Sequence, residues 1–138
     1  MSVLVDTSVW SLALRRGVPR ETPLENELRD LVREGRVVMM GAIRQELLSG
    51  VRVELQFKRL RDRLRAFDDL VLEQADYEDA ATCFNRCRSK GIQGGSIDFL
   101  ICAASARRKL PIFTTDRDFQ HYAKVLPLTL HEPRTRSA

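Results

Sequence analysis

The sequence predicts a single α/β domain whose central sheet is mainly parallel, contains four to five strands and carries helices on both faces. Short apolar runs, typical of buried strands, alternate with segments whose apolar residues recur every three or four positions, the spacing of one helix face. Strands that alternate with helices are joined by right-handed crossovers and lie parallel in one sheet. The 138 residues suffice for one domain with a sizeable core, and no repeat or linker marks a second domain.

The N-terminal segment is expected to hold one strand and two helices. Residues 3–5 form an apolar strand, and Thr7 or Ser8 can cap the short helix that follows. Residues 22–25 read Thr-Pro-Leu-Glu, which is a capping box with proline at the first helical position. This motif predicts a second helix that runs to about Glu34.

The middle of the chain is expected to hold two strands and two helices. Residues 36–40 form the second strand, and residues 70–72 form a short third one. Asp76 can cap the next helix, which ends at Gly91, a residue suited to the left-handed conformation that often follows a helix. An amphipathic helix is predicted between these strands, because apolar residues recur there at Val53, Phe57, Leu60, Leu64 and Phe67.

The C-terminal third begins with a strongly apolar helix that contains an acid. Residues 94–96, Gly-Gly-Ser, open this helix, and the basic residues 107–109 suit its carboxyl end. A strand over 111–115, a short helix over 117–124 and a last strand over 126–130 follow. We therefore expect the domain to span residues 1–132 and residues 133–138 to be a flexible tail.

Composition indicates a folded, cytosolic protein. Apolar residues make up 43% and charged residues 30%, a balance that excludes an intrinsically disordered chain. The chain lacks an apolar run of the roughly 18 to 20 residues that would span a bilayer. The N-terminus has no basic region and its apolar stretch is interrupted by Asp6, so we expect no signal peptide and a cytoplasmic location.

Four acidic residues occupy unusual places in this pattern. Asp6 ends the first strand and Asp116 ends strand 111–115, so both should project from the carboxyl edge of the sheet, where open α/β sheets bind ligands. Asp98 lies in an almost unbroken apolar helix, and a buried carboxylate needs a partner. Glu46 follows the second strand by about one helical turn. Taken singly, Asp6 and Asp116 could serve as a cap and a turn residue, and Glu46 could be a surface residue.

Together the four acids predict a divalent metal site. Two carboxylates about 4 Å apart repel each other by roughly 1 kcal/mol in water and about 4 kcal/mol at a protein-like dielectric. The apolar run around Asp98 contains no lysine or arginine to relieve that repulsion. Oxygen ligands without histidine or cysteine select a hard ion, so we expect Mg²⁺ or Mn²⁺. The net charge of +4 and the pI of about 9.3 favour a polyanionic partner, which together with a metal suggests phosphodiester hydrolysis.

The same residues carry a resemblance to a known family. The motifs around Asp6, Glu46, Asp98 and Asp116 resemble the four motifs of PIN domains in order and spacing, over nearly the whole chain. The likeness extends to the VapC-type toxins of bacterial toxin–antitoxin pairs. It implies a three-layer α/β/α fold in which these four acids ligate the metal. Thr114 matches a supporting hydroxyl residue, and Asp118 matches a position that is acidic in many members, although a helix cap is its alternative role.

The resemblance also implies an activity and partners. PIN-domain toxins are Mg²⁺-dependent endoribonucleases, usually homodimers, which a cognate antitoxin inhibits by placing its tail in the acidic groove. RNA would then be the substrate, with transfer RNA and ribosomal RNA loops as examples from the family. The principal alternative is a non-catalytic RNA- or protein-binding module with a structural metal ion, and a DNA-directed nuclease is a third possibility.

Other residues invite functional readings that the sequence leaves open. Cys83 and Cys87 lie one helical turn apart, but no further ligands have matching spacing, so we expect the three cysteines to be small core residues and not a zinc site. Trp10 could stack on a base, although a core or dimer contact suits its apolar helix better. The basic residues of helix 53–67 alternate with acids, which favours a solvated face. Phosphate contact or a helix-dipole role remains open for Arg86, Arg88, Lys90 and Arg117.

Overall fold

The computed structural model describes residues 1–14 and 22–134, and a parallel sheet lies at the centre of this described part. Its strands are β1 (Val3–Val5), β2 (Val37–Val38) and β3 (Ile112–Phe113), in the order β2-β1-β3. Both pairings are parallel, with Val5 opposite Phe113 on one side of β1. All three residues of β1 are fully buried, which agrees with their uninterrupted apolar sequence. The predicted parallel α/β architecture is confirmed.

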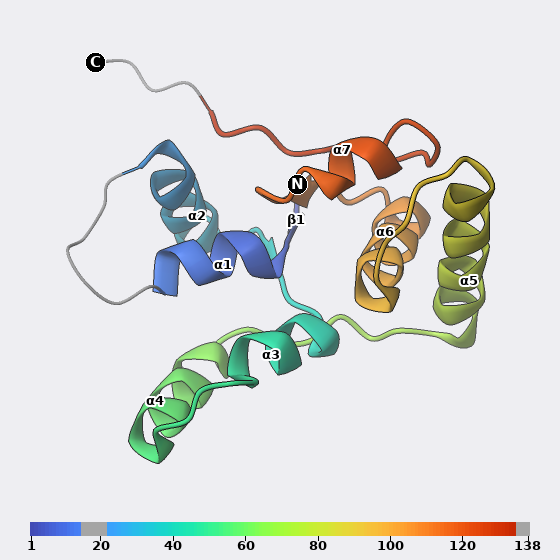
Figure 1. Cartoon of the computed structure of the whole chain (residues 1–138). Helices are drawn as coiled ribbons and strands as arrows, with labels where there is room; N and C mark the ends of the chain where they lie inside the picture. Colours follow the sequence, from blue (N-terminus) through green and yellow to red (C-terminus); the bar gives the residue numbers. More distant parts are fainter. Residues whose placement is uncertain (15–21, 135–138) are drawn as a thin grey trace.

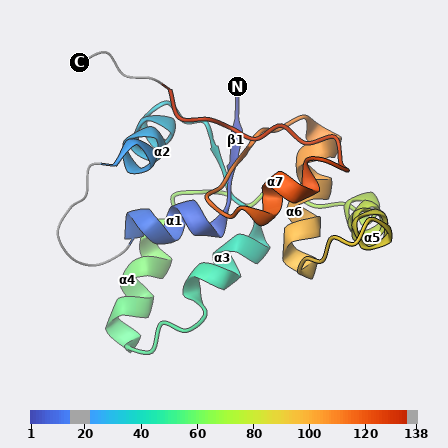
Figure 2. The same cartoon turned by 45° about the horizontal axis from the view of Figure 1, so that its top comes forward.

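Helices flank this sheet and gather at one of its ends. In both views, the α5–α6 pair lies on one side of β1 and α2 lies on the other (Figures 1 and 2). Figure 2 also shows α1, α3 and α7 close to the end of β1 where the strand runs into α1. The helices of the described residues are α1 (Thr7–Leu14), α2 (Pro23–Arg33), α3 (Gly41–Leu48), α4 (Glu54–Leu64), α5 (Gln74–Ser89), α6 (Ser96–Arg108) and α7 (Asp118–Tyr122).

The two outer strands of the predicted sheet are reduced to single bridges. Segment 70–72 is not a strand, because only the neighbouring Asp69 bridges to Met39 and Val71 is 80% exposed. Segment 126–130 likewise contributes one bridge, from Leu130 to Ile112. In both places the chain touches the sheet edge once and then leaves it, so the described residues form three strands rather than four or five.

Helix termini follow local sequence signals, with one correction. The Thr22 hydroxyl accepts a hydrogen bond from the Glu25 amide at 3.2 Å, so Thr22 caps α2 as predicted. At α5, however, the N-cap is Glu73 and Asp76 is the third helical residue of a capping box. The Asp76 carboxylate accepts a hydrogen bond from the Glu73 amide at 2.7 Å.

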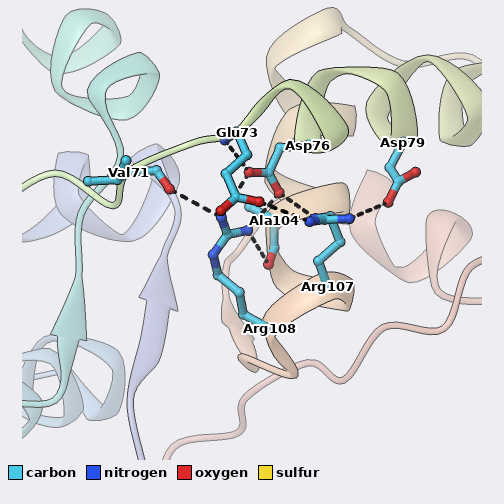
Figure 3. Close-up of polar contacts among 7 residues, drawn as sticks. All are labelled: Val71, Glu73, Asp76, Asp79, Ala104, Arg107 and Arg108. Atoms are coloured by element: carbon cyan, nitrogen blue, oxygen red, sulfur yellow. Dashed lines mark hydrogen bonds and ion pairs between the residues drawn. The ribbon is translucent and has the colours of Figure 1, made fainter.

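Asp76 has a second role that the sequence did not indicate. Its carboxylate is fully buried and accepts two hydrogen bonds from the Arg108 guanidinium, at 2.7 and 2.8 Å (Figure 3). Arg107 Nε lies 2.9 Å from the same carboxylate. These ion pairs connect the first turn of α5 to the last turn of α6, so the basic end of α6 binds a specific buried acid rather than only complementing the helix dipole.

Trp10 is 4% exposed and packs edge-on against Phe67, so it is a core residue. Pairs such as Lys58 with Glu54 confirm a solvated, charge-balanced face on α4.

Of the predicted tail, residues 135–138 lie outside the described residues, whereas Arg134 pairs with the buried Glu27 at 2.9 Å. Within the described residues, no helix combines the length and the apolar character needed to cross a membrane.

Candidate metal centre

Asp6 lies where β1 passes into α1 and is only 5% exposed. Its backbone N–H donates to the Phe113 carbonyl at 2.9 Å, which continues the ladder between β1 and β3. Its carboxylate oxygen Oδ2 accepts hydrogen bonds from the Ser8 and Thr114 hydroxyls, both at 2.8 Å. Within the described residues no lysine or arginine forms an ion pair with this carboxylate, and its neutral hydroxyl donors leave it able to bind a cation.

Thr114 connects Asp6 to Asp116. While its hydroxyl donates to Asp6, its oxygen accepts a hydrogen bond from the Asp116 amide at 3.0 Å. Ser8, at the start of α1, strengthens the connection, since its hydroxyl oxygen accepts a hydrogen bond from the Thr115 amide at 3.0 Å. The carboxyl ends of β1 and β3 are therefore joined by a small hydroxyl network that sets the spacing of the two acids.

Asp98 enters this region from the first turn of α6 and is half-buried. Its Oδ2 accepts a hydrogen bond from the Tyr122 hydroxyl at 2.8 Å. Burial raises the pKa of Asp98 to about 6, the Tyr122 hydrogen bond opposes that rise, and the charges of Asp6, Asp116 and Glu46 add to it. The charges of Asp6, Asp116 and Glu46 therefore act on Asp98.

The closest grouping of acids contains Asp118. Carboxylate oxygens of Asp98, Asp116 and Asp118 all lie within 4.8 Å of one another. Asp118 is the first residue of α7, and its amide donates to Asp116 Oδ1 at 2.9 Å, which fixes the turn between them. Asp118 therefore stands nearer to Asp98 and Asp116 than the sequence alone suggested.

Glu46 lies near this group but outside its closest set. It occupies the last turn of α3, and its Oε1 accepts a hydrogen bond from the Thr7 hydroxyl at 2.8 Å. The position of α3 is maintained by Arg44, which donates to the Leu64 carbonyl at 3.0 Å and pairs with Asp69 at 2.9 Å. Glu46 thus approaches from a separate helix and influences the cluster mainly through its charge.

Sequence reasoning missed three residues that orient the acids. Thr7 and Ser8 were assigned only to capping, although both donate to carboxylates of the cluster. Tyr122 had no assignment, and no local pattern connects it with an acid 24 positions earlier. Its amphipathic position on α7 could have indicated burial but not its hydrogen-bond partner.

The donor set suits a divalent cation of the hard class. The closest group offers carboxylate oxygens alone, and none of the three cysteines belongs to the metal-capable groups of the described residues. Burial and, to a smaller extent, the neighbouring acids raise the pKa of Asp98, and a cation among the carboxylates would oppose the contribution of those acids. Residues 98, 116 and 118 could hold the ion directly, with Asp6 and Glu46 adjoining.

Comparison with known proteins identifies the family and the fold of the chain. The model of the PIN domain family matches residues 3–125. Comparison with curated protein sequences finds no match. Among solved structures, the fold is similar to FitAcB from Neisseria gonorrhoeae, at 21% identity and a TM-score of 0.75 over 95% of this chain and 97% of that one. It is also similar to VapBC2 from Rickettsia felis bound to a promoter DNA fragment, at 16% identity and a TM-score of 0.76 over 95% and 98% of the two chains. A toxin–antitoxin complex from Klebsiella pneumoniae matches at 19% identity, with a TM-score of 0.61 over 86% and 90%.

Proposed function

Because the chain belongs to the PIN domain family, we propose that it is a cytoplasmic, Mg²⁺-dependent endoribonuclease and the VapC-type toxin of a toxin–antitoxin pair. The observation that carries this proposal is the convergence of Asp98 from α6, Asp116 from the segment after β3 and Asp118 from the start of α7, with carboxylate oxygens within 4.8 Å of one another. Mn²⁺ is expected to substitute for Mg²⁺, since both prefer oxygen ligands.

The proposed metal ligands are Asp6, Glu46, Asp98 and Asp116, with Asp118 as a further candidate. When bound, a divalent ion would lower the pKa of a water molecule and offset negative charge on the scissile phosphate. The chain's own contribution is orientation. Ser8 and Thr114 hold one oxygen of Asp6, and Tyr122 holds one oxygen of Asp98. Because these hydrogen bonds hold one oxygen of each acid, the side chain is fixed and its other oxygen has a defined direction.

The activity is tested by incubating the purified chain with labelled single-stranded RNA and, in parallel, single-stranded DNA of the same sequence. We expect cleavage of the RNA in Mg²⁺ or Mn²⁺, none in EDTA, and none by the Asp98→Asn variant while its circular dichroism spectrum is unchanged. Asp68→Asn is the matched control, since Asp68 is an exposed acid between α4 and α5. Preferential DNA cleavage would instead identify a DNA nuclease, and metal binding without cleavage would identify a binding module.

The toxin assignment rests on the family and on the structural neighbours, which include a toxin–antitoxin complex. We propose that a small antitoxin protein covers the group of acids around Asp98 and Asp116 and that the chain forms a homodimer. Expression of the chain alone should arrest bacterial growth, and expression of the Asp98→Asn variant should not. Growth arrest by the unmodified chain and by the Asp98→Asn variant alike would show that toxicity does not depend on the proposed cleavage.

A further inference from the structure

A polar hollow lies directly beside the acid cluster, that is, the carboxylates of Asp98, Asp116 and Asp118 with Asp6 and Glu46 adjoining. It has a volume of about 230 Å³ and is lined by Gly91, Ile92, Gln93, Asp118, His121 and Tyr122. Two of these residues also belong to the cluster's surroundings, because Asp118 is one of the three closest acids and Tyr122 donates to Asp98. A group bound in this hollow would therefore lie next to whatever occupies the acid cluster.

The loop that joins α5 to α6 forms one wall of this hollow and is held against Tyr122. A Cβ atom placed on Gly94 would lie 2.2 Å from the Tyr122 hydroxyl oxygen, so only glycine allows the backbone this close. The turn at Gly91 has a φ of +77°, which again favours glycine. Because Tyr122 contacts both Gly94 and Asp98, the loop has a defined position relative to the acids.

The polar side chains of the hollow are available to a ligand. Gln93 and His121 are exposed, and within the described residues neither side chain makes a hydrogen bond or an ion pair. The Gln93 amide offers both a donor and an acceptor, and the two ring nitrogens of His121 add another of each in the neutral form. Ile92 supplies an apolar wall, and Tyr122, whose side chain is fully buried, also lines the hollow. This combination matches a flat heterocycle with polar edges.

A second hollow continues the first and suits a neighbouring nucleotide. It has a volume of about 260 Å³ and shares Ile92 and Gln93 with the first. Arg88 and Phe84 also line it, and the Arg88 guanidinium lies over the Phe84 ring, 5.3 Å from the ring centroid. Aromatic rings and arginine guanidinium groups are the side chains that contact bases and phosphates of single-stranded nucleic acid.

We propose that the hollow around Gln93 and His121, here called the base pocket, binds one unstacked base of single-stranded RNA next to the scissile phosphate, and that Arg88 and Phe84 contact the following nucleotide. This inference rests on the proposed nuclease function and adds a specificity site to it. The base edge faces Gln93 and His121, and the backbone passes the acid cluster. Arg88 is then one of the phosphate-contacting basic residues that the sequence left open.

The test measures RNA binding separately from cleavage. Fluorescently labelled single-stranded RNA oligonucleotides, each with one abasic nucleotide at a different position, are titrated with the full chain in Ca²⁺. For the unmodified chain, we expect one or two abasic positions to weaken binding by about tenfold, the size of one lost base contact. In the His121→Ala and Gln93→Ala variants, intact RNA should bind about tenfold more weakly, and the abasic positions should have no further effect.

Matched variants and a second readout make the outcome decisive. Gln120→Ala changes an exposed neighbour on the same helix and should bind like the unmodified chain. Cleavage-site mapping on a randomised RNA should show a preference at one flanking nucleotide that His121→Ala and Gln93→Ala relax. Unchanged affinity and abasic sensitivity in both variants would overturn the base pocket even if RNA is cleaved. Loss of base-dependent binding would support it even in a chain that hydrolyses nothing.

Discussion

Tyr122 donates its phenolic hydrogen to Asp98 Oδ2 at 2.8 Å, and the same hydroxyl oxygen lies against the backbone of Gly94. A single buried side chain on α7 thus touches both the acid on α6 and the loop that precedes that helix. The orientation of Asp98 therefore depends on a residue that was not recognisable as part of the site from its sequence context.

Removing this hydroxyl should weaken metal binding. In Tyr122→Phe the hydrogen bond that favours ionised Asp98 is lost, so the pKa of Asp98 should rise above its present value of about 6. We expect the Kd for Mn²⁺, measured by calorimetry, to increase about three- to tenfold at pH 6 and less at pH 8, where the carboxylate is ionised in both proteins. Tyr77→Phe alters a 57%-exposed tyrosine on α5 and is the control. Equal Kd values for the two variants would contradict the orienting role of Tyr122.

The acid cluster should lower the stability of the metal-free chain at neutral pH. The pKa of Asp98 is raised from 3.8 in the unfolded state to about 6 in the folded state. The favourable contribution of the protonated carboxyl group to the free energy of unfolding is therefore fully present below about pH 4 and is lost as the pH rises through 6. In EDTA, Asp98→Asn should therefore be more stable than the unmodified chain by about 1 kcal/mol above pH 6, after allowance for solvent screening, and equal to it near pH 4. Urea denaturation from pH 4 to 8 measures this difference, and a pH-independent difference would exclude a titrating Asp98 as its source.

The ion pairs of Asp76 should be the main electrostatic interaction that holds α5 against α6, and their contribution to stability should be lost in acid. Hydrogen bonds from Arg108 hold the pKa of Asp76 well below its usual range despite its burial. A depressed pKa gives stability that is present above the unfolded value near 3.8 and is lost as the pH falls below it. At pH 7, Asp76→Asn should reduce the free energy of unfolding by about 3 kcal/mol, because it leaves Arg108 without its anionic partner.

Asp79→Asn provides the comparison for this cluster. Asp79 pairs with Arg107 at 3.4 Å but its side chain is 50% exposed, so its loss should cost less than about 1 kcal/mol. Urea denaturation at pH 7 and at pH 3 should show the difference between the two variants shrinking at the lower pH. Similar losses for Asp76→Asn and Asp79→Asn would mean that burial adds nothing to this interaction.

Thr114 should be more important than its neighbour Thr115. Thr114→Val removes a donor to Asp6 and an acceptor for the Asp116 amide, and we expect a loss of about 1 to 2 kcal/mol in stability. Mn²⁺ binding should weaken about tenfold, because two acids lose their common support. Thr115→Val is the control, since Thr115 enters the network only through its backbone amide. Denaturation and calorimetry on both variants would reveal whether the hydroxyl of Thr114 carries these effects.

Much of the architecture could be predicted because its signals are local. The buried β1 follows from three consecutive apolar residues, and the start of α2 follows from Thr22 and the proline after it. The sheet edges could not be predicted equally well, since segments 70–72 and 126–130 have strand-like composition yet touch the sheet only once. Strand pairing depends on where the neighbouring helices direct the chain, and composition does not contain that information.

The chain's order of residues was enough to establish a parallel α/β fold and to single out Asp6, Glu46, Asp98 and Asp116 as metal-ligand candidates, because the ends of parallel strands meet at one edge whatever the details of packing. Only the folded molecule revealed that Asp118 joins the closest group, that Tyr122 orients Asp98 and that Asp76 is buried against Arg108. The physical reason is distance along the chain. Local patterns specify backbone conformation, whereas the partner of a buried polar group is chosen by the packing of elements that are remote in sequence.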